Sequence, residues 1–330
     1  MKKWTIAFVN YKTSVYMKWQ LKGLYKFNDP SEFNVIIVDN SNPHEITALN
    51  KIIKSYQYKH KNIEIIYHNP QEPTASGQHG EALTLALKRT KTKYFLTQDP
   101  DFFWVKQNYL KLFETYLESG KVAIGAPYPN RVGVGHPWFP CAYGCAHITD
   151  MIKDLDFHAD ASQERREESF RLYPLKDGFE FSFDVGWKIR EKLSNKDDSS
   201  NFISFGQRDA IDLKKLIGVH SYGCITKEYL LDSQTIAFHL FRGSFTDRVD
   251  SKGIDANKDV PQLWTITRDK FGKYFYENLC ENGKISLKRQ ILNRLYNLPK
   301  NIREARRSVI RIRLNKNQKM IKLFGVDLIK

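Results

Sequence analysis

Short apolar runs alternate along the first 125 residues with longer segments in which apolar and polar positions are mixed. Alternation of this kind predicts strands that are joined by helices, and therefore an α/β fold with right-handed crossovers. We expect a doubly wound, mainly parallel sheet flanked by helices. The predicted strands span residues 5–9, 34–38, 63–67, 94–97 and 122–125, and the predicted helices span residues 15–25, 45–56, 77–89 and 109–117.

Polar side chains follow these apolar runs where each predicted strand ends. Tyr11, Asp39 and Asn69 follow the first three runs, and Asp99 and Asp101 follow the fourth. Ligands of parallel sheets bind beyond the carboxyl ends of the strands, which lie at one edge. The convergence of these residues at that edge predicts a binding site.

The two carboxylates after the fourth run are separated by a single residue, Pro100. Proline fixes its own φ and pushes the preceding residue into an extended conformation, which predicts a stiff turn that leaves the strand abruptly. Carboxylate oxygens are the ligands that Mg²⁺ and Mn²⁺ prefer, so Asp99 and Asp101 form a candidate platform for a metal-bound diphosphate. An ordinary surface turn is the alternative.

Glycine-rich phosphate loops are missing from the places where nucleotide-binding folds need them. After the first predicted strand no glycine occurs before Gly23, and the later Gly133-Val134-Gly135 lacks the third glycine of a dinucleotide-binding motif. The chain also has no Gly-Lys-Ser/Thr phosphate loop. A nucleotide would therefore be held by side chains and a metal ion.

Four segments follow one another along the chain: Asn10-Tyr11, Val38-Asp39-Asn40-Ser41, Gly77-Gln78-His79-Gly80 and Gln98-Asp99-Pro100-Asp101. Their order resembles that of the bacterial family 2 nucleotide-sugar glycosyltransferases, which have the GT-A fold. The resemblance covers most of residues 4–245 and includes an Asp-x-Asp motif at Asp99 and Asp101. It implies that Asp39 contacts the nucleotide base and that Asp99 and Asp101 contact ribose and metal. Gln78 stands where the family often has Asn, in a turn before a helix.

Two further segments resemble motifs of the same family. Residues 183–190 are similar to its acidic motif, which implies that Asp184 is the general base of an inverting reaction. The stretch 235–244 resembles its histidine-containing strand end, which implies His239 as a third metal ligand and Arg242 as a partner of the departing diphosphate. The alternatives stay open. Asp184 is also a favoured N-cap for a helix over residues 185–193, Glu180 or Asp177 are rival bases, His239 can be a core histidine, and His220 is its rival.

Composition indicates a globular chain kept in the cytosol. Of the 330 residues 41% are hydrophobic, and no apolar run approaches the roughly 18 residues of a membrane-spanning helix. The four cysteines have neither paired metal spacing nor the density of a disulfide scaffold. Residues 128–183 include the aromatic and proline-rich stretch 136–140, for which we expect acceptor or lid contacts.

The net charge of +15 is concentrated near the C-terminus, where residues 284–330 contain fourteen Lys and Arg but two acidic residues. Apolar positions at helical spacing between these cations predict a basic amphipathic helix. Such a helix suits an anionic membrane surface. A solvated cap on the main domain and a nucleic-acid surface are the alternatives, although we expect no nucleic-acid partner.

These observations together predict an inverting, metal-dependent glycosyltransferase of the hexosyltransferase type, with Mn²⁺ or Mg²⁺ as cofactor. The donor would be a nucleotide diphosphate sugar, and the acceptor a hydroxyl of a glycan or lipid-linked glycan in cell-surface polysaccharide or glycoconjugate synthesis. We expect a donor-binding half at residues 1–127, an acceptor-binding and catalytic half at 128–270, and a basic helical region at 271–330. The enzyme would be peripheral on the inner face of the cytoplasmic membrane. A haloacid-dehalogenase-like phosphatase and a non-enzymatic carbohydrate- or membrane-binding module are the alternatives.

Overall fold

The computed structural model describes residues 2–11, 13–41, 46–127, 135–159, 183–195, 197–209 and 226–240, and two residue pairs near the C-terminus. The chain divides into two units, Met1–Gly283 and Lys284–Lys330. In the second unit the described residues form two short antiparallel strands, β12 (Lys322–Leu323) and β13 (Val326–Asp327). The predicted basic amphipathic helix lies outside the described residues.

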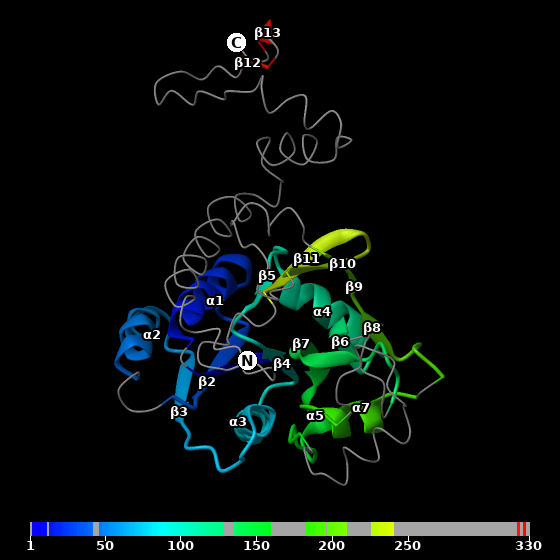
Figure 1. Ribbon diagram of the computed structural model, residues 1–330, viewed down its shortest axis with the longest axis horizontal. Coiled ribbons are helices and arrows are strands. Elements are labelled where there is room, and N and C mark those ends of the chain that lie inside the picture. The colour runs from blue at the N-terminus through cyan, green and yellow to red at the C-terminus, as the bar shows by residue number, and fades with distance from the viewer. Residues whose placement is uncertain are drawn as a thin grey trace, which may run out of the picture. The chain divides into compact units, whose positions relative to one another are not determined.

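A seven-stranded sheet forms the centre of the first unit, with the strand order β3-β2-β1-β4-β7-β6-β8 (Figure 1). Strand β7 is antiparallel to both of its neighbours, and the other six strands run in one direction. This arrangement confirms the predicted α/β class with a mainly parallel sheet. The strands are β1 (Trp4–Asn10), β2 (Phe33–Asp39), β3 (Ile63–Tyr67), β4 (Tyr94–Gln98), β6 (Ala123–Pro127), β7 (Pro140–Ile148) and β8 (Phe202–Ser204).

Helices cover both faces of this sheet. Residues of α1, α2 and α4 belong to one apolar core cluster, and residues of α3, α5 and α7 belong to a second cluster on the opposite face (Figure 1). The sheet is therefore the middle layer of three. The helices are α1 (Ser14–Phe27), α2 (Ile46–His60), α3 (Ala75–Arg89), α4 (Tyr109–Glu118), α5 (Thr149–Ile152) and α7 (Trp187–Leu193).

The alternating side chains of β1 show why the strands are continuously apolar. Trp4, Ile6 and Phe8 pack in the first core cluster, whereas Ala7 and Val9 pack in the second. Successive side chains of a strand point to opposite faces, and a strand that is covered on both faces needs apolar residues at every position. The apolar runs in the sequence therefore mark the central strands of a three-layer fold.

A second, antiparallel sheet has the order β5-β11-β10-β9. Its first strand, β5, begins four residues after β4 ends, so the chain passes from one sheet to the other through a short turn. Strands β10 and β11 are joined by a two-residue turn, Asp232-Ser233, in which both residues have positive φ, the geometry that suits a tight hairpin. The strands are β5 (Phe102–Trp104), β9 (Gly206–Asp209), β10 (Thr226–Leu231) and β11 (Gln234–Leu240).

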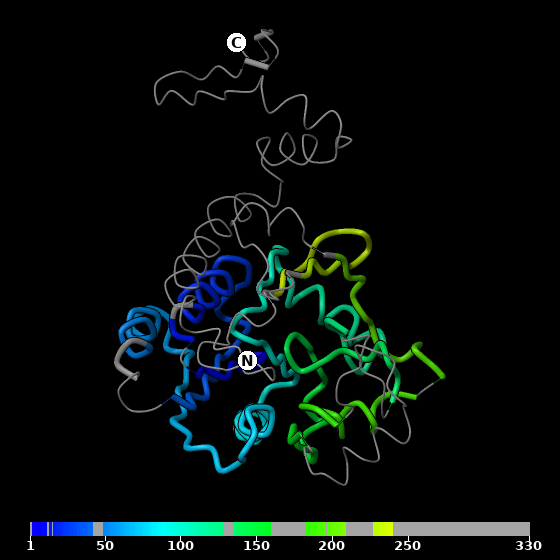
Figure 2. Tube along the Cα trace, in the orientation of Figure 1, coloured from blue at the N-terminus to red at the C-terminus, as the bar shows by residue number. Residues whose placement is uncertain are grey.

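The antiparallel strand β7 was not expected from the sequence, because residues 136–140 were interpreted as a contact loop and the residues after them were not assigned. The strand order separates the chain into two parts: β3, β2, β1 and β4, from the first part of the chain, lie next to one another, and β7, β6 and β8 follow them. In Figure 2 the first group is blue to cyan and the second is green. In the described part of the chain, no helix is both long and apolar enough to cross a membrane. The predicted division of the first unit at residues 127 and 128 stays a prediction.

Candidate functional site

The acidic turn Asp99-Pro100-Asp101 links the two sheets. Strand β4 ends at Gln98 and β5 begins at Phe102, so the turn leaves the large sheet abruptly, as predicted. The backbone N–H of Asp99 donates to the carbonyl oxygen of Tyr143 at 2.9 Å, and the N–H of Phe102 donates to the carbonyl oxygen of Asp99 at 3.1 Å. The turn is thus tied to β7 and closed on itself.

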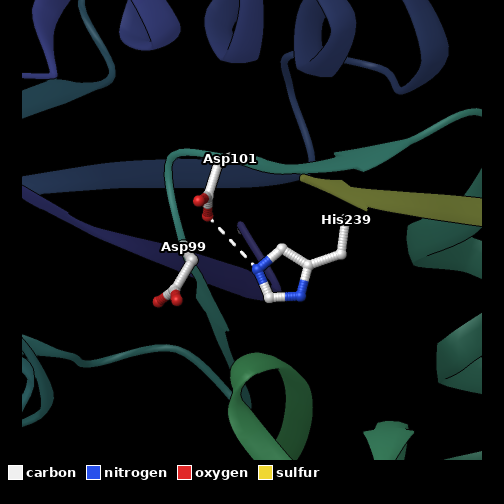
Figure 3. A group of neighbouring side chains, drawn as sticks. All are labelled: Asp99, Asp101 and His239. Carbon is white, nitrogen blue, oxygen red and sulfur yellow. Dashed lines mark ion pairs between the residues drawn. The ribbon is translucent and has the colours of Figure 1, made fainter. Parts of the chain in front are cut away.

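His239, near the end of β11, lies against this turn because β11 pairs with β5 and places His239 opposite Phe102. Its Nε2 is 3.3 Å from Oδ1 of Asp101, and the two residues are 3% and 2% exposed. The ring of Tyr143 stacks on the imidazole at a centroid distance of 4.8 Å. Figure 3 shows the Asp101 carboxylate directed at the His239 ring, with Asp99 beside the pair.

Asp99, Asp101 and His239 form a three-residue cluster with the chemistry of a metal site. Each offers one ligand atom, and these atoms lie within 4.8 Å of one another. Two carboxylates and an imidazole suit Mn²⁺ or Mg²⁺. A largely buried pair of acids is costly without a cation close by, so the residues present fit a divalent metal ion. The structure therefore brings together the three residues that the sequence nominated as metal ligands.

The N-terminal part of α3 lies beside this cluster. His79 Nε2 is 3.4 Å from Oδ1 of Asp99. Thr74 caps this helix, since its hydroxyl accepts from the N–H of Gly77 at 3.0 Å. A helix N-terminus carries partial positive charge and suits anionic groups. His79 had no predicted role, although it belongs to the segment Gly77-Gln78-His79-Gly80. Its position next to Gln78 was the one sign in the sequence that it could lie at the site.

Asp39, at the end of β2, is 1% exposed. Its Oδ1 accepts hydrogen bonds from Asn10 Nδ2 at 2.9 Å and from the backbone N–H of Ser41 at 3.0 Å. Its Oδ2 is buried and has no hydrogen-bond partner within the described part of the chain. A buried carboxylate oxygen without a donor is costly, so this position suits a ligand that brings a donor group.

Gln78 serves the local structure in a way that the sequence did not indicate. Its side-chain Nε2 donates to the backbone carbonyl oxygen of Glu72 at 2.9 Å. The backbone carbonyl oxygen of Gln78 accepts from Asn40 Nδ2 at 3.1 Å. Gln78 therefore connects the loop before α3 with the end of β2. Tyr11, another predicted contact, lies half-exposed directly after β1.

His68 lies at the end of β3 where Asn69 was predicted to contact the nucleotide. Asn69 is exposed, whereas His68 Nδ1 lies 3.0 Å from Asn40 Oδ1 and His68 Nε2 lies 3.4 Å from Glu81 Oε1. The side chain that faces the neighbouring strand end is therefore that of His68. The nucleotide contact predicted for Asn69 stays a prediction.

Asp184 precedes α7 but does not cap it. Helix α7 begins at Trp187, and its N-cap is Gly186 with φ 80°, so the alternative in which Asp184 caps a helix over residues 185–193 is wrong. The left-handed φ at the cap position favours glycine, which moves the helix start two residues downstream. The carbonyl oxygen of Asp184 accepts from the N–H of Trp187 at 3.0 Å.

Asp184 and residues 139–142 line one pocket, together with Trp187 and Arg190. Strand β7 connects this pocket to the acidic turn, because the carbonyl oxygen of Tyr143 accepts the hydrogen bond from Asp99. Asp184 therefore lines a pocket with the first residues of β7, the strand to which the acidic turn is hydrogen-bonded. Four residues named from the sequence lie outside the described residues: Asp177, Glu180, His220 and Arg242.

No protein-family model matches the sequence, and neither does any curated protein. Three solved structures have the following likeness to it. Residues 1–349 of TarS from S. aureus share 16% identity, with 89% of this chain and 79% of that chain covered and a TM-score of 0.41. The mannosyltransferase PcManGT from Pyrobaculum calidifontis shares 10% identity, with coverage of 92% and 82% and a TM-score of 0.40. The galactosyltransferase LgtC shares 13% identity, with coverage of 61% and 72% and a TM-score of 0.40. At these identities and TM-scores the likeness assigns no activity to the chain.

Proposed function

We propose that the protein is a glycosyltransferase that uses a nucleotide diphosphate sugar and a divalent metal ion. The observation that carries this proposal is the convergence of Asp99, Asp101 and His239 at the carboxyl end of β4. In a parallel sheet this edge is where ligands bind. An anionic ligand can bind next to two carboxylates only if a cation lies between them. A metal ion held by the acidic cluster would supply that cation for a diphosphate.

The donor would lie across the ends of β1, β2 and β4. The buried Oδ2 of Asp39 has no hydrogen-bond donor in the described part of the chain, and a nucleotide base or ribose can donate a hydrogen bond to it. His79, near the N-terminus of α3, lies beside Asp99, so the diphosphate would lie close to this helix end. When bound at the cluster, Mn²⁺ or Mg²⁺ supplies charge stabilisation for the leaving diphosphate.

Asp184 is the proposed general base of an inverting reaction. Its carboxylate would accept the proton of an acceptor hydroxyl while that oxygen forms a bond to the anomeric carbon. The bond from the anomeric carbon to the diphosphate breaks, and the diphosphate leaves with the electron pair. The support for this role is that Asp184 lines a pocket together with residues 139–142. Arg242 stays a predicted partner of the diphosphate.

The test of the donor site is calorimetry with UDP, GDP, dTDP and CMP, each with and without Mn²⁺. We expect metal-dependent binding of one of them, and its loss in Asp101→Asn. Asp150→Asn is the matched control, because Asp150 is an exposed aspartate on α5. Absence of binding by every nucleotide contradicts the proposal, and the phosphatase or the non-enzymatic binding module then becomes the better assignment.

The acceptor and the location belong to the same proposal. The basic residues 284–330 would hold the enzyme on an anionic membrane surface, where a lipid-linked glycan can serve as acceptor. Co-sedimentation with vesicles that contain phosphatidylglycerol compares the full chain with a chain that ends at residue 283. Equal binding by the two chains removes the tail from the proposal.

A further inference from the structure

The side chain of Gln20 contacts the acidic turn. Gln20 belongs to α1, which packs on the face of the sheet that carries the first core cluster. Its Nε2 donates to the carbonyl oxygen of Pro100 at 2.7 Å and to the carbonyl oxygen of Phe102 at 2.7 Å. These two carbonyl groups flank Asp101 in the chain. A single carboxamide thus holds the backbone on both sides of a candidate metal ligand. Gln20 is 4% exposed, so this contact is shielded from water.

A second buried amide supports the first. Gln98 Nε2 donates to the carbonyl oxygen of Phe102 at 2.7 Å and also to Oε1 of Gln20. Gln98 Oε1 accepts from Trp104 Nε1 at 3.0 Å. Both N–H groups of each amide and both amide oxygens are therefore used, and turning either amide over would place like groups against each other. The network fixes one orientation of both side chains.

A shift of the backbone that this network holds would disturb two candidate metal ligands, Asp101 and His239. Phe102 follows Asp101 directly, and its backbone pairs with His239 in the ladder between β5 and β11. Movement of the Phe102 carbonyl group would therefore change the position of Asp101 and its distance to His239. A buried polar network is costly unless all its groups are paired, and here they hold one turn in place.

We infer that Gln20, supported by Gln98, is a positioning residue that holds the Asp101 carboxylate in the geometry required for metal binding. This inference rests on the proposed function, because it takes the cluster to be a metal site. Gln20 acts through the backbone of the turn, because its hydrogen bonds go to the carbonyl oxygens of Pro100 and Phe102. Hydrogen-bond partners behind metal ligands typically change metal affinity by about 10- to 100-fold when they are removed.

The test measures the dissociation constant of Mn²⁺ alone by electron paramagnetic resonance, at a temperature where each variant is folded. Gln20→Met keeps the length of the side chain and removes its donors and acceptor. Leu24→Ala, on the same helix and also buried, is the matched control for loss of stability. We expect Gln20→Met to raise the dissociation constant about tenfold or more, and Leu24→Ala to leave it within about twofold.

The outcomes separate this inference from the proposed function. Absence of Mn²⁺ binding by the natural chain overturns both. Binding by the natural chain with equal binding by Gln20→Met, or an equal loss in the two variants, overturns the positioning role alone. Should Gln20→Met fail to fold, Trp104→Phe replaces it, since it removes the hydrogen bond to Gln98 and keeps an aromatic ring next to Tyr109. For Trp104→Phe a threefold or greater loss of affinity supports the role, and an unchanged affinity overturns it.

Discussion

Oδ1 of Asp101 lies 3.3 Å from Nε2 of His239, although the turn after β4 supplies one residue and β11 supplies the other. The contact exists because β5 pairs with β11 immediately beyond the acidic turn. A buried carboxylate and an imidazole in this arrangement can share one cation. The second sheet therefore completes a site that the first sheet begins.

Replacing His239 with glutamine tests this relationship. Glutamine fills much of the same space but replaces the imidazole nitrogen with a neutral amide oxygen, so a bound metal would be held by a weaker ligand. We expect kcat/KM for glycosyl transfer to fall at least about 100-fold, because stabilisation of the leaving diphosphate is a large part of catalysis. Steady-state kinetics over a range of Mn²⁺ concentrations measure the effect. His60→Gln, on α2, is the control, and equal activity of the two variants would remove His239 from the site.

Asp39→Asn separates binding from stability. The buried Oδ2 of Asp39 has no hydrogen-bond partner in the described part of the chain, and replacing the carboxylate with an amide removes a buried charge. We expect the free energy of unfolding to rise by about 1 kcal/mol, while nucleotide affinity falls about tenfold. Urea unfolding and calorimetry measure the two quantities. A variant that binds nucleotide as well as the natural chain would show that Asp39 has only a structural role.

Asp184→Asn tests the proposed base. The amide keeps the shape of the side chain but cannot accept the acceptor's proton, so we expect kcat to fall about 10²- to 10⁴-fold with nucleotide affinity unchanged. Single-turnover transfer to a glycan acceptor, with nucleotide binding measured in parallel, gives both values. Glu191→Gln changes an exposed acid on α7 and is the control. Full activity of Asp184→Asn would transfer the role to another carboxylate.

His147, in β7, makes stability depend on pH. Burial lowers the pKa of His147 to about 3, and its Nε2 lies 3.1 Å from Sγ of Cys145. The neutral ring is favoured in the folded chain, whereas the unfolded chain takes up a proton below its pKa of about 6.5. The free energy of unfolding is therefore highest above about pH 6.5 and falls progressively as the pH falls towards 3. Between pH 7 and pH 5 we expect this group to remove about 2 kcal/mol of stability. Urea unfolding of the natural chain and of His147→Gln should show the smaller pH dependence in the variant, and parallel slopes would contradict the assignment.

Local pattern was sufficient for the central strands and the four helices between them. The apolar runs that became β1, β2, β4 and β6 are buried on both faces, and such strands carry their signal in consecutive residues. The run that became β3 lies at the edge of the sheet, where Glu64 and Tyr67 are exposed. The abrupt acidic turn followed from Pro100, since proline restricts its own φ and that of its neighbour. These features depend on residues that are adjacent in the chain.

The pairing of strands that are distant in the sequence could not be predicted from the local pattern of apolar and polar residues. Strand β5 has three residues and is defined by its pairing with β11, and β7 inserts antiparallel between two parallel neighbours. The start of α7 was misplaced because the left-handed φ of Gly186 is visible in the structure but carries no distinct sign in the sequence. Each of these features is set by contacts with distant residues.

By itself the sequence determined the α/β class, the position of the acidic turn and, through a family resemblance, the three candidate metal ligands. Tertiary structure decided that Asp101 and His239 meet, that His79 and His68 lie at the same edge, and that Gln20 holds the turn. The physical reason is that burial and backbone conformation leave a periodic or stereochemical pattern along the chain. The pairing of two sheets and the closure of a buried hydrogen-bond network leave none, because their partners are brought together by folding.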